Sequence, residues 1–248
     1  MKILLTNDDG IDSDGIQKLA ETLRSRGHRV YVIAPDINRS GISHAVSLLN
    51  GPVKLSACGE DTWSCTGYPA DCVIVGLLGA LREKPDLVLS GINKGANIGT
   101  DIIYSGTAAA ARQGSLSGIP AVALSLAGIN DYSTSGANEY YWDMAASWSA
   151  DHLEELKAYW ERNTFVNVNI PNNPKGPEGM AITRPAIKNY NDAITVMDAP
   201  DGSRWCFIKA GKETAESGAD NDWNTVSRNF VSVSRLHIYA VAREGKKD

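Results

Sequence analysis

The sequence has little cysteine and no long apolar run. Its 248 residues include four cysteines, none of them in a C-x-x-C pair, and no histidine stands at a zinc-like spacing from them. A disulfide framework and a structural zinc site are therefore not expected. No apolar run reaches the roughly 18 residues that a membrane-spanning helix needs. Acidic residues appear by Asp8, too early for a signal peptide, so we expect a cytoplasmic protein without a membrane partner.

The sequence also has no excess of basic residues. The formal net charge is -5, whereas nucleic-acid duplexes and anionic membranes attract basic surfaces, so we expect neither as a partner. A phosphate ligand would then be held locally, by a cation or by backbone N–H groups. The motifs G-x-x-x-x-G-K-[ST], G-x-G-x-x-G and G-x-S-x-G are also absent. Their absence argues against a P-loop enzyme, a dinucleotide-binding enzyme and an α/β-hydrolase.

The first two thirds of the chain alternate short apolar runs with helical patterns. This alternation is typical of an α/β fold with a parallel sheet. We expect a three-layer Rossmann-like core over residues 1–127, structurally continuous with a second part over residues 128–248. Strands are predicted at residues 3–6, 30–34, 45–49, 53–57, 86–90 and 120–125, and helices at about residues 13–27, 69–83 and from 107 onward.

The second part has a different pattern. Residues 128–138 are polar and predict a loop, residues 140–162 predict one long amphipathic helix, and residues 165–170 predict a closing strand. Beyond Gly179 the pattern is β-rich, with few large apolar residues. Segments of this kind gain stability by pairing with another chain. We therefore expect a smaller β-rich C-terminal lobe, or an arm that is swapped between the copies of a homo-oligomer.

Polar residues follow the predicted parallel strands, where α/β sheets bind their ligands. The first strand ends in Asn7-Asp8-Asp9-Gly10, and the strand at residues 120–125 ends in Ser125. Two adjacent carboxylates repel each other unless a proton or a cation lies between them. Oxygen ligands favour hard cations such as Mg²⁺, Mn²⁺ or Ca²⁺. Asp8 and Asp9 therefore indicate a metal site or, with equal weight, a solvated turn.

Neighbouring loops add neutral groups to these carboxylates. Ser40 follows the second strand and Asn93 follows the strand at residues 86–90, so each is a candidate metal ligand, although both residue types commonly form turns in loops. Asn97 and the run Ser105-Gly106-Thr107 precede a predicted helix N-terminus, where free N–H groups and the macrodipole favour an anion. We predict a phosphate site at this helix, with an ordinary capped helix as the alternative.

Seven segments together carry a resemblance: ILLTNDDGI at residues 3–11, APD to SG at 34–41, PADCV at 69–73, SGINKGAN at 90–97, YSGT at 104–107, GIPA at 118–121 and NVNIP at 167–171. In order and spacing the chain resembles the SurE family of survival-protein nucleotidases. The resemblance implies a Rossmann-like fold and hydrolysis of nucleoside 5'-monophosphates, with 3'-monophosphates as further candidates. It also implies homodimers or homotetramers with exchanged C-terminal segments.

The same resemblance implies a ligand set and residue roles. One divalent metal ion per subunit, Mg²⁺ or Mn²⁺ with Ca²⁺ as an alternative occupant in crystals, would be held by Asp8, Asp9, Ser40 and Asn93. Asp8 and Asp9 would be the catalytic residues, and Asn97, Ser105, Gly106 and Thr107 would bind the phosphate. Two other classes stay open: a Rossmann-like sugar-nucleotide transferase and a non-catalytic nucleotide-binding module. A metal-dependent phosphate-release assay with and without an acceptor sugar would separate the two enzymes.

Overall fold

The computed structural model describes residues 1–128 and 139–240, so nearly all of the predicted loop at 128–138 lies outside the described residues. Within those ranges nine strands form one sheet, in the order β3-β4-β2-β1-β5-β6-β7-β13-β8. The strands from β4 to β7 in this order are parallel, whereas β3 and β13 run antiparallel to their inner neighbours. The bounds are β1 (Lys2–Thr6), β2 (Arg29–Pro35), β3 (Leu55–Gly59), β4 (Thr62–Cys65), β5 (Leu87–Lys94), β6 (Ala121–Ala127), β7 (Thr164–Pro171), β8 (Gly179–Ile182) and β13 (Phe230–His237).

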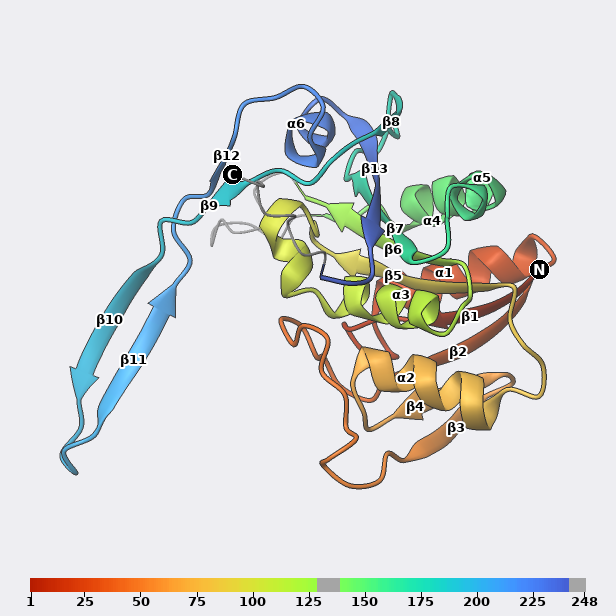
Figure 1. Ribbon diagram of the computed structural model, residues 1–248, viewed down its shortest axis with the longest axis horizontal. Coiled ribbons are helices and arrows are strands. Elements are labelled where there is room, and N and C mark those ends of the chain that lie inside the picture. Colours follow the sequence, from red (N-terminus) through yellow and green to blue (C-terminus); the bar gives the residue numbers. More distant parts are fainter. Residues whose placement is uncertain (129–138, 241–248) are drawn as a thin grey trace, which may run out of the picture.

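Helices cover both faces of this sheet, which confirms the predicted three-layer α/β architecture (Figure 1). One face carries α1 (Asp14–Ser25), α4 (Trp142–Asp151) and α5 (Leu153–Ala158). The opposite face carries α2 (Pro69–Val75), which continues into a π-helical turn, and α3 (Gly106–Leu116). Among the helices of the described ranges, none combines the length and the apolar character needed to cross a bilayer.

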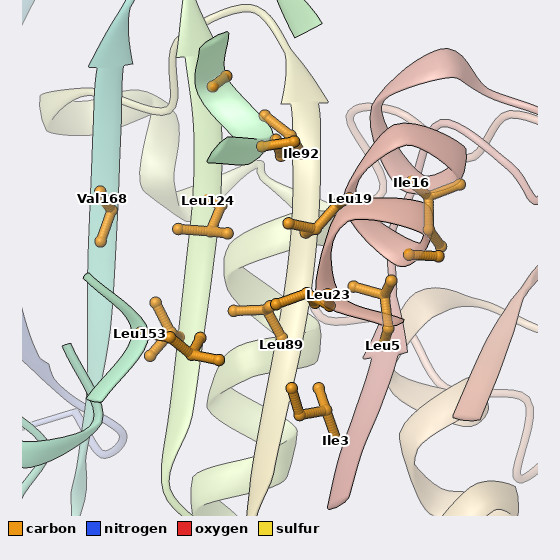
Figure 2. Packing of buried hydrophobic residues seen from close by; sticks show 14 of the residues in the cluster. Ile3, Leu5, Ile16, Leu19, Leu23, Leu89, Ile92, Leu124, Leu153 and Val168 are labelled. Atoms are coloured by element: carbon orange, nitrogen blue, oxygen red, sulfur yellow. The ribbon is translucent and has the colours of Figure 1, made fainter. Parts of the chain in front are cut away.

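The helix α1 shows how the sequence pattern builds the core. Its residues Ile16, Leu19 and Leu23 recur at helical spacing and are fully buried. They belong to the same apolar cluster as Leu5 of β1 and Leu89 of β5, and Figure 2 shows these side chains between the helix and the sheet. This packing fixes α1 and β1 relative to each other, and therefore fixes the polar segment that joins them.

The predicted long helix at residues 140–162 is wrong, because two helices occupy that segment. α4 ends at Asp151 and α5 begins at Leu153. His152 divides them: its Nδ1 donates a 2.9 Å hydrogen bond to the carbonyl of Trp148, and the two rings stack. The backbone N–H of His152 also bonds the carbonyl of Trp148, at 3.1 Å, so this carbonyl accepts two hydrogen bonds at the junction of the two helices.

Residues 45–49 form no strand, contrary to the prediction. Ser47 donates both its N–H and its hydroxyl to the carboxylate of Asp71, and these bonds hold the segment in a turn. Leu48 and Leu49 are consequently exposed. Local side-chain bonds of this kind offer the backbone an alternative to a sheet ladder.

Beyond β8 the chain leaves the body of the protein and forms an arm. β10 (Ala193–Asp198) and β11 (Arg204–Lys209) pair as an antiparallel hairpin that projects away from the sheet in Figure 1. Every residue of both strands is exposed. At the base of the arm, β9 (Lys188–Asn189) pairs with β12 (Thr214–Ala215). The chain then returns through α6 (Asp222–Ser227) to β13, which lies inside the main sheet between β7 and β8.

Candidate functional site

The strand order creates a switch point beside β1. β2 lies on one side of β1 and β5 on the other, and this arrangement opens a crevice at the carboxyl ends of β1 and β5. Asp8 and Asp9 follow β1 directly. Asn93 lies in β5 itself, not in the predicted loop after it, because a register shift between Ser90 and Asn93 lets the strand continue to Lys94.

A cavity of about 490 Å³ lies at these strand ends. It is lined by five of the residues predicted from the sequence: Asp8, Ser40, Asn93, Asn97 and Ser105. The other three, Asp9, Gly106 and Thr107, do not line the cavity. Each of them instead contacts or adjoins a lining residue, so the structure groups all eight around one cavity.

Asp8 is the most deeply buried of the predicted metal ligands. The residue is 3% exposed, and its Oδ1 accepts a hydrogen bond of 2.5 Å from Thr107 Oγ1. Burial raises the pKa of Asp8 to about 6, and the Thr107 hydroxyl opposes this shift because it stabilises the charged form. A Cβ on Gly106 would lie 2.7 Å from the Cβ of Asp8. The first turn of α3 is therefore built closely against this carboxylate.

Asp9 is half-buried and bonds to the end of β5. Its Oδ2 accepts the backbone N–H of Lys94 at 3.0 Å, and burial also raises the pKa of Asp9. Among the ion pairs of residues 1–128 and 139–240, none includes Asp8 or Asp9. Asp8 is thus almost fully withdrawn from water and Asp9 in part, and neither forms an ion pair with a described residue. The nearby charge of Lys94 opposes the rise in the pKa of Asp9.

This set of donors fits a hard divalent cation. Carboxylates, a hydroxyl and an amide oxygen are the ligands that Mg²⁺, Mn²⁺ and Ca²⁺ prefer. Asn93 Nδ2 donates to the carbonyl of Gly95 at 2.9 Å, which leaves the amide oxygen of Asn93 for another partner. No group of three or more His, Cys, Asp or Glu side chains suited to a metal occurs in the part of the chain that the structure describes. A zinc-type site, which needs such a group, does not fit.

The helix α3 presents its N-terminus to the same cavity. Ser105 is the N-cap residue, and its Oγ accepts the N–H of Ala108 at 3.0 Å. The first N–H groups of a helix have no intrahelical partner, and with the macrodipole they favour an anion. Asn97 lies in the same cavity, with its Nδ2 2.8 Å from Ser125 Oγ. The candidate ligands for a cation and the candidate ligands for an anion therefore lie around one cavity.

The far wall of the cavity was not predicted. It consists of Asp101, Tyr104, Tyr140, Tyr190, Asp192 and Glu213. The buried Lys188 forms ion pairs with Asp101 and Glu213, and Tyr190 donates its hydroxyl to Asp101 at 2.5 Å, so the base of the arm is joined to the turn before α3. Asp101 lies in a short 3-10 helix, and the other residues of this wall lie in loops or in a weakly patterned stretch, where no periodicity marks them.

Known proteins resemble this chain over nearly its whole length. The family model described as "Survival protein SurE" matches residues 3–192. Two relatives named 5'-nucleotidase SurE, from Methylocella silvestris and Xanthomonas euvesicatoria, are each 36% identical to it; the matches cover 96% of this chain and 94% and 90% of those proteins. The crystal structure of the SurE protein from Aquifex aeolicus matches with a TM-score of 0.83 and 35% identity, over 97% of this chain and 95% of that one. The chain belongs to the SurE family.

Proposed function

We propose that this protein is a divalent-metal-dependent phosphatase that hydrolyses nucleoside 5'-monophosphates to nucleoside and phosphate. The observation that carries the proposal is the convergence of two adjacent carboxylates, neither of them in an ion pair within the described ranges, and a helix N-terminus on one cavity. The relatives named 5'-nucleotidase support the substrate class. Hydrolysis of 3'-monophosphates is a secondary proposal, because nothing in the phosphate site itself distinguishes the two positions.

Asp8, Asp9, Ser40 and Asn93 are the residues that would hold the cation. When bound, the cation supplies positive charge that neutralises the phosphate and stabilises charge in the transition state. The protein supplies the rest by position. Thr107 holds Asp8 in one orientation through its 2.5 Å hydrogen bond. We assign the remaining phosphate oxygens to Asn97, Ser105, Gly106 and Thr107 at the start of α3.

The cavity has room for more than a phosphate group. It extends from the strand ends to the rings of Tyr104 and Tyr190, which offer flat surfaces to a nucleobase. The side chains of Asp192 and Glu213 on the same wall carry oxygen atoms that can accept hydrogen bonds from ribose hydroxyls. We therefore assign the nucleoside half of the substrate to this wall.

Phosphate release from a panel of nucleoside 5'- and 3'-monophosphates tests this function. The protein is first freed of metal with EDTA and then supplied with Mg²⁺, Mn²⁺ or Ca²⁺. We expect release only with a cation present, and loss of release in Asp9→Asn. Asp14→Asn, which changes an exposed carboxylate of α1, is the matched control. Full activity of metal-free Asp9→Asn protein would contradict the proposal.

The two alternative functions give different results in the same assay. A sugar-nucleotide transferase would need an acceptor sugar, and it would release a nucleotide rather than free phosphate. A non-catalytic nucleotide-binding module would bind a monophosphate without turnover. The complete set of proposed metal ligands around one cavity favours a catalyst over such a module.

We also infer a homodimer or homotetramer in which the arm is exchanged between copies. The support is the exposure of large apolar side chains on β10 and β11, including Ile194, Trp205 and Ile208. A two-stranded hairpin standing alone in water is marginally stable, so a neighbouring copy is the natural cover for it.

A further inference from the structure

Asn97 is held in place by a set of buried polar side chains that carry no assigned role. Its N–H donates to Asn169 Oδ1 at 2.8 Å, and its carbonyl accepts from Asn167 Nδ2 at 2.9 Å and from Asn169 Nδ2 at 3.0 Å. Its own Nδ2 donates to Ser125 Oγ at 2.8 Å. The backbone and the side chain of Asn97 are therefore fixed by separate partners.

Two of these partners, Ser125 and Asn169, lie in one row across the sheet with Asn93. Asn93 of β5 pairs in register with Ser125 of β6, and Ser125 pairs with Asn169 of β7. Residues paired across neighbouring strands share a face of the sheet. Asn167 precedes Asn169 by two positions and so lies on this face as well. The row therefore links a proposed metal ligand, Asn93, to the support beneath Asn97.

Polar side chains at these three buried positions do not favour the stability of the fold. Ser125, Asn167 and Asn169 are fully buried on central strands, where apolar side chains are the usual occupants. Asn167 Oδ1 has no hydrogen-bond partner, and an unsatisfied buried acceptor is costly. These polar side chains lower the stability of the fold, and all three bond to one cavity residue, Asn97. This combination indicates a role in the site.

We propose that Ser125, Asn167 and Asn169 form an amide clamp, a set of positioning residues that orients Asn97 toward the phosphate. Asn169 makes a two-point contact with the Asn97 backbone, and Asn167 adds a second donor to the same carbonyl. Ser125 takes one of the two Nδ2 hydrogens of Asn97, which fixes the rotation of the amide. The second hydrogen is then directed to a phosphate oxygen. This inference rests on the proposed function, because it takes Asn97 to be a phosphate ligand.

Binding of inorganic phosphate in the presence of Mn²⁺, measured by calorimetry, tests the clamp without relying on turnover. We expect Ser125→Ala to raise the dissociation constant for phosphate about tenfold and the KM for a nucleoside monophosphate by a similar factor. Binding of Mn²⁺ alone should not change. Ser90→Ala is the matched control, because it removes a fully buried hydroxyl without a hydrogen-bond partner from the neighbouring strand β5. Its phosphate affinity should stay within twofold of wild type.

A double-mutant cycle separates positioning from a general structural effect. In an Asn97→Ala background, Ser125→Ala should weaken phosphate binding by less than twofold, because its effect passes through Asn97. A loss as large as in the wild-type background would overturn the clamp, and so would wild-type phosphate affinity in Ser125→Ala. Asn169→Leu, which removes both contacts to the Asn97 backbone, should weaken phosphate binding more than Ser125→Ala, with folding checked by thermal denaturation.

The same measurements distinguish failure of the clamp from failure of the proposed function. Wild-type protein that binds phosphate but releases none from any nucleotide would contradict the proposed hydrolysis. The clamp would then still be decided by the double-mutant cycle, which measures phosphate binding. Wild-type protein that does not bind phosphate at all would overturn both. An unchanged Ser125→Ala variant of an active enzyme would overturn the clamp alone.

Discussion

Thr107 Oγ1 donates a 2.5 Å hydrogen bond to Asp8 Oδ1, although 99 positions separate the two residues in the chain. The bond joins the loop after β1 to the first turn of α3, and thereby connects the proposed cation ligands to the proposed phosphate site. The Asp8 carboxylate forms no ion pair with any residue that the structure describes, so in the metal-free protein this bond is one of the few interactions that stabilise its charged form.

The first prediction concerns the stability of the metal-free protein. Burial raises the pKa of Asp8 from 3.8 to about 6, so the folded state binds this proton more tightly than the unfolded state does. The free energy of unfolding should therefore fall as the pH rises from about 4 through 6, by about 3 kcal/mol for a shift of about two pKa units. Asp8→Asn should remove this loss and raise the melting temperature in EDTA at neutral pH. Saturating Mn²⁺ should stabilise wild type and leave Asp8→Asn unchanged.

The melting temperature of both proteins, measured in EDTA between pH 4.5 and 8, checks this expectation. Glu155→Gln, an exposed change in α5, is a control for the removal of one negative charge. An Asp8→Asn protein that melts below wild type at neutral pH would show that ionised Asp8 does not destabilise the metal-free fold.

The second prediction concerns Gly106. A Cβ at this position would lie 2.7 Å from the Cβ of Asp8, so Gly106→Ala must displace either the carboxylate or the first turn of α3. We expect a loss of at least tenfold in kcat/KM and weaker binding of Mn²⁺. Gly79→Ala is the control, since a Cβ at Gly79 meets no atom within 4 Å. Equal activity of the two variants would mean that the helix start tolerates the methyl group.

The third prediction concerns Lys188. Its side chain is 2% exposed and forms ion pairs with Asp101 and Glu213, which are themselves mostly buried. Lys188→Met would leave two carboxylates without their cation, and removal of one partner from a buried ion pair costs about 3 to 5 kcal/mol. Urea denaturation should show a loss of this order, with Lys175→Met, an exposed change, as the control. A loss no greater than in Lys175→Met would show that the two carboxylates are solvated without the lysine.

The fourth prediction concerns the arm. Simple truncation near Gly202 would also remove β13 from the main sheet, so it cannot test the arm alone. Ala193 and Lys209 are paired in register, and a short Gly-rich turn between residues 192 and 210 can therefore replace the hairpin. Sedimentation should show an oligomer for the full chain and a lower oligomeric state for the hairpin-deleted chain. A full chain that sediments as a monomer of 26.6 kDa would contradict the exchange.

The core of the fold was predictable because its strands are buried on both faces. The runs at β1, β2, β5 and β6 are short, apolar and bounded by turn residues, and the carboxyl ends of such strands converge. This reasoning places Asp8 and Asn93 at the same edge of the sheet. It does not locate Asn93 within the strand, because a register shift leaves no mark in the apolar pattern.

The arm and the clamp show where prediction from the sequence ends. Both faces of β10 and β11 are exposed, so no one-sided alternation distinguishes the hairpin from a lobe. In β7, Asn167 and Asn169 alternate with buried apolar residues, a pattern that usually indicates a strand with one solvent-facing side. The structure places them in the interior instead. Polar residues at alternate positions of a strand can therefore mark a buried support for a site.

The position of β13 between β7 and β8 has a consequence for synthesis on the ribosome. The strands from β1 to β7, which carry or precede every proposed cation and phosphate ligand, emerge first. β8 has no neighbour in the sheet other than β13, which emerges roughly 50 residues later. At roughly 5 to 20 residues per second, the nascent chain spends several seconds with the edge of β7 open. An open edge templates pairing with other strands, so the chain is most exposed to mispairing with a neighbouring nascent copy during that interval.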